Sequence, residues 1–140
     1  MSSPVSIRFP DPVAARLRRR SSRSGEAVSG IVVRLVDEGM RMEDHPGVVF
    51  RDGPAGRRAG LAGGPDVWEI ITVLGDFGSA GPASAVTMTA KWLNLTEAQV
   101  RTAEGYYSSF PDEVDERMAD NAEAAVGAQR AASVRGRLYG

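Results

Sequence analysis

The sequence predicts a mainly α-helical protein made of two modules and a tail, and two observations support this prediction. Apolar residues at helical spacing, with capping residues beside them, recur along most of the chain, whereas period-two alternation is confined to short stretches. The charge is also divided: residues 1–41 have eight basic and four acidic residues, whereas residues 42–140 have nine basic and fourteen acidic residues. The net charge of −1 therefore hides a basic module suited to nucleic acid and an acidic remainder.

The first module, residues 1–41, begins with a short strand that has no partner strand nearby. Alternation places Val5, Ile7 and Phe9 on one face of this strand and Ser6 and Arg8 on the other. A lone strand leaves backbone groups unpaired along both edges, and its simplest partner is the same strand of a second copy. The strand therefore predicts a homodimer.

Two helices should follow the strand. Asp11 is expected to cap the first helix, Gly25 to end it in the left-handed conformation, and Gly39 to end the second helix. The first helix is basic and carries Arg16, Arg18, Arg19, Arg20 and Arg23. The second helix has a wide apolar stripe of Val28, Ile31, Val32, Leu35 and Val36.

A strand, a helix, a glycine turn and a second helix follow one another over residues 4–40, and this order resembles the ribbon-helix-helix family of DNA-binding proteins, to which Arc and MetJ belong. The resemblance implies an intertwined dimer whose paired strands form a ribbon in the major groove of double-stranded operator DNA. Ser6 and Arg8 would then contact base edges. Arginine binds guanine through two hydrogen bonds, and a serine hydroxyl donates or accepts one.

The same resemblance implies phosphate contacts and a dimer core. In this family the free amides at the start of the second helix bind phosphate. The matching positions here are Ser29 and Gly30, and Arg23 is expected to contact phosphate as well. Ala27 stands where a Ser or Thr cap is common, and the loss of such a cap costs about 1 kcal/mol. The dimer core would contain Val5, Ile7, Phe9, Ile31 and Leu35.

The second module, residues 42–118, is expected to begin within a polar connector over residues 41–44. Short runs at 48–51 and 57–61 flank a cluster of glycine and proline, which predicts a β-hairpin. Asp66 should cap a helix that ends near Gly75. Its inward residues would be Val67, Ile70, Ile71 and Leu74. Residues 75–85, rich in Gly, Ala, Ser and Pro, predict a long loop.

A helix-turn-helix should complete the second module. A first helix over 86–93 is followed by a tight turn and by a second helix, which begins with a capping box of Thr96 and Gln99. Pro111 should stop the second helix. The buried residues of that helix would be Val100, Ala103, Tyr107 and Phe110. His45, beside Pro46, is expected to pack or to cap rather than to catalyse.

Residues 45–118 resemble an uncharacterised family of small, homeodomain-like helical domains found in bacterial antitoxins. The resemblance is carried by residues 45–50, Arg57 and Arg58, residues 66–70, residues 95–103, Tyr106 and Tyr107, and residues 111–115. The helix-turn-helix also suggests a second DNA-reading surface at Gln99, Arg101 and Thr102. Glu97 and Glu104 lie beside these residues and would repel phosphate, so protein binding or dimer support is the favoured role of this module.

The tail, residues 119–140, has helix propensity but little that could form a core. Such a segment either frays or folds onto a partner. The resemblance to VapB-type antitoxins implies that the tail blocks a PIN-like ribonuclease toxin, whose metal-holding carboxylates an arginine would neutralise. The candidate toxin-binding residues are Arg130, Arg135, Arg137, Leu138 and Tyr139.

Catalysis, metal binding and membrane insertion are not expected. The chain has no cysteine and one histidine, and it lacks the residue spacings of a metal cluster, a catalytic triad or a phosphate-binding glycine loop. We therefore predict no catalytic residue, no metal and no cofactor. No apolar run approaches the roughly 20 residues that span a bilayer, which favours a cytoplasmic protein without a membrane partner.

The resemblances, together with these patterns, imply a homodimeric antitoxin of a type II toxin-antitoxin system that represses its own operon and neutralises a PIN-like ribonuclease. Two alternatives stay open. The chain could be a stand-alone ribbon-helix-helix transcriptional regulator without a toxin, or a dimeric interaction protein that does not bind DNA. Steep salt dependence of DNA binding would separate a DNA-binding protein from the last of these.

Overall fold

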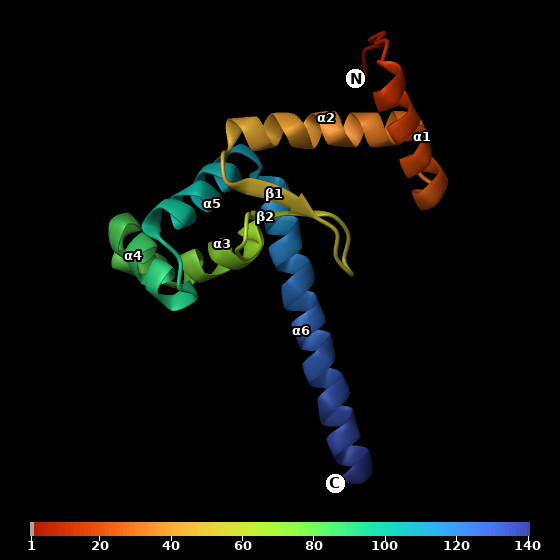
Figure 1. The fold of residues 1–140 in the computed structure, drawn as a ribbon. Coiled ribbons are helices and arrows are strands. Elements are labelled where there is room, and N and C mark those ends of the chain that lie inside the picture. The colour runs from red at the N-terminus through yellow and green to blue at the C-terminus, as the bar shows by residue number, and fades with distance from the viewer. Residues whose placement is uncertain (1) are drawn as a thin grey trace. The chain divides into compact units, whose positions relative to one another are not determined.

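The computed structural model describes residues 2–140, which separate into an N-terminal unit that ends at Glu43 and a C-terminal unit that begins at Asp44. Six α-helices, one short 3₁₀-helix and one two-stranded antiparallel sheet make up the regular structure of the described residues (Figure 1). The mainly helical fold class predicted from the sequence is therefore confirmed.

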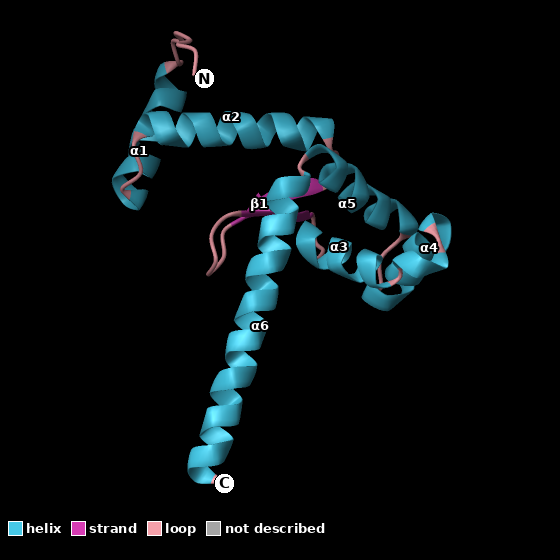
Figure 2. Ribbon diagram, turned by 180° about the vertical axis from the view of Figure 1, so that it is seen from behind, coloured by secondary structure: helices cyan, strands magenta, loops and turns pink. Residues whose placement is uncertain are grey.

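The N-terminal unit consists of an irregular segment and two helices. Residues 2–10 form neither helix nor strand, α1 spans Asp11–Ser24 and α2 spans Val28–Asp44 (Figure 2). Gly25 ends α1 with a φ of 74°, the left-handed conformation that was predicted. A β-ribbon needs hydrogen bonds from a second strand, so the strand proposed around Ile7 stays a prediction.

Two predicted boundaries in this unit are wrong. Pro10 occupies the N-cap position of α1, and Asp11 is the first helical residue, where its negative charge favours the helix dipole. Gly39 does not end α2, which continues to Asp44 and makes the predicted polar connector helical. An ion pair of 3.2 Å between Arg41 and Asp37, one turn apart, stabilises this last part of the helix.

The C-terminal unit begins with the predicted hairpin. Strands β1 (Val48–Arg51) and β2 (Arg58–Leu61) pair antiparallel, and Val48 lies opposite Leu61. Helix α3 (Val67–Asp76) follows, and its capping box joins Asp66 to Glu69, whose Oε2 accepts a hydrogen bond of 2.9 Å from the Asp66 amide. The sequence predicted both the hairpin and the cap of α3.

The predicted long loop over residues 75–85 is much shorter in the structure. Helix α3 extends to Asp76, and the short 3₁₀-helix η1 covers Gly78–Ala80. Helix α4 (Pro82–Leu93) begins with a proline, which is favoured in the first turn of a helix. Asn94 then turns the chain with a φ of 55° into α5 (Glu97–Ser109), which Thr96 and Gln99 cap as predicted. Helix α6 (Pro111–Tyr139) follows directly.

One hydrophobic core joins the hairpin, the three helices α3 to α5 and the start of α6. Its most buried members include Val48, Val67, Ile70, Val100, Ala103 and Tyr106. Tyr106 is fully buried and the neighbouring Tyr107 is partly exposed, so the predicted burial of Tyr107 is wrong by one position. The rings of His45 and Tyr106 pack in a T-shaped arrangement with their centroids 5.5 Å apart, consistent with the packing role expected for His45.

Helix α6 leaves this core after its second turn. Val114 is buried and Met118 packs against the core, but every residue from 119 to 140 is exposed. In Figure 1 the helix extends well beyond the other helices of its unit. The tail, which the sequence allowed to be either frayed or folded onto a partner, is therefore a continuous helix with no support from the rest of its own unit.

Candidate functional site

The predicted DNA-contacting residues of the N-terminal segment are accessible. Ser6 and Arg8 are exposed. Val5 and Ile7, which were predicted to enter a dimer core, are 77% and 61% exposed, while Phe9 is partly buried. The segment thus presents both a polar and an apolar set of side chains that the single chain leaves uncovered.

Helix α1 presents a surface of unpaired arginines. Leu17 is the buried residue of this helix, whereas its five arginines are exposed at positions 16, 18, 19, 20 and 23. None of the five forms an ion pair with an acidic side chain within residues 2–140. Their charge is therefore available to an anionic partner.

The start of α2 combines free amides with an acidic side chain. The first helical hydrogen bond of α2 is donated by the Ile31 amide to the Ala27 carbonyl at 3.1 Å. The amides of Ser29 and Gly30, the predicted phosphate site, come before this bond in the first turn of the helix. Oε2 of Glu26 lies 3.6 Å from the position that a Cβ atom on Gly30 would take. Glu26 also pairs with Arg34 at 3.1 Å. A carboxylate therefore lies close to Gly30, beside the predicted phosphate site.

A broad apolar face of α2 has no cover in the single chain. Ile31, predicted for the dimer core, is already buried at 1% exposure, and Leu35 is partly buried. Val33, Val36 and Met40 are 70%, 50% and 55% exposed. Sequence reasoning missed Val33 because this residue lies beside the predicted apolar stripe, and it missed Met40 because it ended the helix at Gly39.

Helices α4 and α5, which the sequence predicts to form a helix-turn-helix, use two of the three candidate DNA-reading residues in hydrogen bonds within α5 and its cap. Oε1 of Gln99 accepts a hydrogen bond of 2.8 Å from the Thr96 amide, and Oγ1 of Thr102 donates to the Ala98 carbonyl at 3.0 Å. Arg101 alone among the three is exposed. These bonds favour a structural role for this part of α5.

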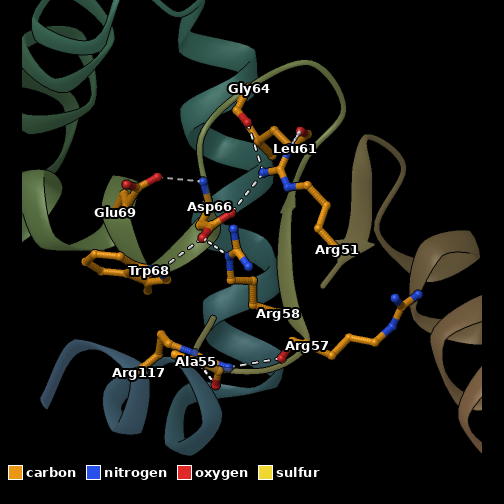
Figure 3. Close-up of polar contacts among 10 residues, drawn as sticks. All are labelled: Arg51, Ala55, Arg57, Arg58, Leu61, Gly64, Asp66, Trp68, Glu69 and Arg117. Carbon is orange, nitrogen blue, oxygen red and sulfur yellow. Dashed lines mark hydrogen bonds and ion pairs between the residues drawn. The ribbon is translucent and has the colours of Figure 1, made fainter. Parts of the chain in front are cut away.

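A network around Asp66 ties the hairpin to α3 (Figure 3). The Asp66 carboxylate accepts hydrogen bonds from Arg51 at 3.0 Å, from the indole N–H of Trp68 at 3.2 Å, and from Arg58. Arg51 also donates to the carbonyls of Leu61 and Gly64. Asp66 is nearly buried, and three donors compensate its charge.

Arg117 extends this scaffold to α6. Its guanidinium donates to the backbone carbonyls of Ala55 at 2.8 Å and Arg57 at 3.0 Å, as the lower part of Figure 3 shows. Several of the residues on which the resemblance of this module rests, including Arg58, Asp66 and Trp68, therefore hold the scaffold together. Their polar groups contact one another and not an open site.

The predicted toxin-binding residues lie on the exposed part of α6, but they do not form one cluster. Arg130 and Arg137 are seven residues apart and share one side of the helix, whereas Arg135 lies on the opposite side. Leu138 and Tyr139 are 69% and 85% exposed at the end of the helix. A single partner surface would therefore meet Arg130 and Arg137 together, and Arg135 separately.

No helix within residues 2–140 has the length and apolar character needed to cross a bilayer. Comparisons with protein-family models, with curated proteins and with solved structures find no significant match for this chain.

Proposed function

We propose that this protein is the antitoxin of a type II toxin-antitoxin system. It dimerises and binds operator DNA through its N-terminal unit, represses its own operon, and neutralises a PIN-like ribonuclease through α6. The observation that carries the proposal is the composition of the N-terminal surface, which joins unpaired arginines to uncovered apolar side chains within about forty residues.

The apolar part of this surface supports a homodimer. Leu17 and Ile31 are the buried apolar side chains of the N-terminal unit, and two such residues are too few to stabilise a unit of this size alone. Pairing with a second copy covers Val5, Ile7 and the exposed face of α2. The same pairing gives the N-terminal segment the strand partner that it needs.

The charged part of the surface supports DNA binding. Residues 2–43 have eight basic and five acidic residues, whereas residues 44–140 have nine basic and thirteen acidic residues. In the proposed dimer Arg8 and Ser6 read base edges, and the arginines of α1 lie close to phosphates, with Arg23 among them. The acidic C-terminal unit stays free for a protein partner.

The toxin-binding role is proposed for the exposed half of α6. This half carries three arginines and no acidic residue from position 124 onwards. PIN-like nucleases hold their metal with carboxylates, which attract a guanidinium through charge-assisted hydrogen bonds. An unsupported helix of this length gains stability when a partner covers it.

DNA binding is tested by fluorescence anisotropy with the DNA upstream of the gene, at two salt concentrations. The intact protein should bind, and its affinity should fall steeply as salt rises. Arg8→Ala should cost roughly 1–3 kcal/mol at one base position and leave the dimer intact. Arg101→Ala is the matched control, because it removes an exposed arginine from α5. A loss with Arg101→Ala and none with Arg8→Ala would refute the ribbon assignment.

Toxin neutralisation is tested with the nuclease encoded beside this gene. Replacing Arg130, Arg135 and Arg137 by alanine should abolish inhibition of the nuclease and leave operator binding intact. Unchanged inhibition by this triple variant would refute the proposed role of α6. Failure of a neighbouring nuclease to co-purify with the intact protein would instead favour a stand-alone regulator.

A further inference from the structure

Helix α6 carries a row of charges whose sign changes at its middle. Glu116, Glu123, Arg130 and Arg137 follow one another at intervals of seven residues, so they lie along one side of the helix. We call these four residues the charge stripe. From first to last they span about 31 Å at 1.5 Å per residue.

The stripe has no side-chain partner within the described residues 2–140. All four side chains are exposed, and none makes a hydrogen bond or an ion pair with another side chain in residues 2–140. The helix itself offers no opposite charge three or four residues away from any of them. Two of the nearest side chains, Asp112 and Asp120, carry the same charge as Glu116. In an isolated helix, Glu116 at the acidic end of the stripe is therefore repelled by its acidic neighbours.

We infer that α6 pairs antiparallel with α6 of a second copy along this stripe. A two-fold axis between residues 126 and 127 places Glu116 opposite Arg137 of the other copy, and Glu123 opposite Arg130. Because a two-fold interface makes each contact twice, four opposite-charge pairs form at once. A parallel arrangement puts like charges side by side at all four positions.

The residues beside the stripe fit this close approach. Val126 and Gly127 flank the proposed axis, and the absence of a side chain at Gly127 lets the two backbones approach there. Val126 and Val134 are 47% and 49% exposed in the single chain, and pairing removes their apolar surface from water. Pairing also gives the unsupported half of α6, with its glycines at 127 and 136, the contacts that it lacks.

This self-association goes beyond the proposed function and does not depend on it. The two meet at Arg130 and Arg137, which the proposed function assigns to the toxin. Pairing of α6 and toxin binding therefore compete for the same side chains.

Because the chain has no cysteine, single cysteines report the register directly. In the full-length protein, Val126→Cys should crosslink efficiently between copies with a short bis-maleimide. Ser133→Cys is the matched control: it lies opposite residue 120 in the antiparallel register, about 20 Å along the axis from its own counterpart. Equal crosslinking at both positions, or none at position 126, would overturn the inference.

Charge reversal tests the stripe itself. Glu116→Lys with Glu123→Lys turns all four attractive pairs into repulsive ones, and it should weaken self-association through α6 about tenfold, seen as loss of the Val126→Cys crosslink. Co-expression of this variant with a copy carrying Arg130→Glu and Arg137→Glu should restore the crosslink between unlike copies. An unaffected crosslink, or no restoration, argues against pairing. Operator binding by the same variants separates this outcome from failure of the proposed function.

Discussion

The N-terminal and C-terminal units differ in how far the apolar faces of their helices are buried within one chain. In the C-terminal unit, α3, α4 and α5 share one core, in which Ile70, Val100 and Tyr106 are fully buried. The N-terminal unit has two helices and leaves Val33, Val36 and Met40 of α2 exposed. The difference supports the proposal that the first unit depends on a second copy for its stability, whereas the core of the second unit forms within one chain.

The core of the C-terminal unit should give the largest effect. Ile70→Ala removes fully buried methyl and methylene groups and should lower the free energy of unfolding by about 2–5 kcal/mol. Chemical denaturation followed by circular dichroism measures this loss, which should not depend on protein concentration.

The matched change in the N-terminal unit is Val36→Ala, at a half-exposed position of α2. Its effect should appear as a lower midpoint of unfolding that depends on protein concentration, because the lost contact would belong to the proposed dimer. If the effect of Val36→Ala does not vary with concentration, the contrast between the two units is mistaken.

The Asp66 network should give the next largest effect. Asp66→Ala leaves Arg51, Arg58 and the indole of Trp68 without their shared acceptor, and we expect a loss of about 1–3 kcal/mol because the arginines keep partial access to water. Asp52→Ala is the control. It removes an exposed carboxylate paired with Arg57 at 3.2 Å, and it should cost less than about 0.5 kcal/mol. Equal losses would mean that burial of the network does not matter.

A smaller effect, a gain in DNA affinity and not a loss of stability, is expected at the start of α2. Glu26→Gln removes the carboxylate beside Gly30, so a phosphate should bind there more tightly, by about 0.3–1 kcal/mol. Glu43→Gln removes the same charge from the other end of the helix and serves as the control. Anisotropy titrations with operator DNA should show a gain for the first variant alone. An equal gain for both would assign the effect to net charge.

Local signals explain which parts of the fold could be predicted from the sequence. The capping boxes at Asp66 and Thr96, the left-handed Gly25 and the hairpin each depend on residues a few positions apart. The errors lie at glycine-containing stretches that the structure nevertheless makes helical. Gly39 was interpreted as a helix end, yet α2 continues past it. The glycine-rich stretch over 75–85 contains η1 and the start of α4.

The candidate sites follow the same rule. The charge stripe of α6 depends only on helical spacing, and it became apparent once the helix was known to reach Tyr139. The Asp66 network could not be predicted, because Arg51 and Arg58 lie fifteen and eight residues away and meet at the carboxylate only through the register of the hairpin. The prediction chose Tyr107 in place of its neighbour Tyr106 as the buried tyrosine of α5. Both side chains are aromatic, and only packing in the folded structure determines which one is buried.

The smallest expected effect lies at the junction of α5 and α6, and it tests the contrast between the two adjacent tyrosines. The hydroxyl of Tyr107 donates to Oδ1 of Asp115 at 2.7 Å, and this hydrogen bond, together with partial burial and the nearby charges of Asp115 and Asp112, raises the pKa of Tyr107 above its usual value of about 10. The folded protein therefore holds this proton more tightly than the unfolded chain does. The stabilisation is fully present below about pH 10 and should be lost as the pH rises through the higher pKa of the folded state.

Urea denaturation at pH 8 and at pH 11 compares the wild type with Tyr107→Phe. The wild type should lose more stability than the variant between these two conditions, because the other tyrosines titrate in both proteins and cancel in the difference. Asp115→Asn keeps an acceptor for the Tyr107 hydroxyl but removes the charge. The loss of stability of this variant between pH 8 and pH 11 should therefore lie closer to that of Tyr107→Phe than the wild-type loss does. An identical decline in wild type and Tyr107→Phe would mean that the bond between α5 and α6 does not persist in solution. In that case the direction in which α6 leaves the core is set by the remaining contacts, which include buried Val114, Arg117 and the hydrogen bond that the Tyr106 hydroxyl donates to Glu113.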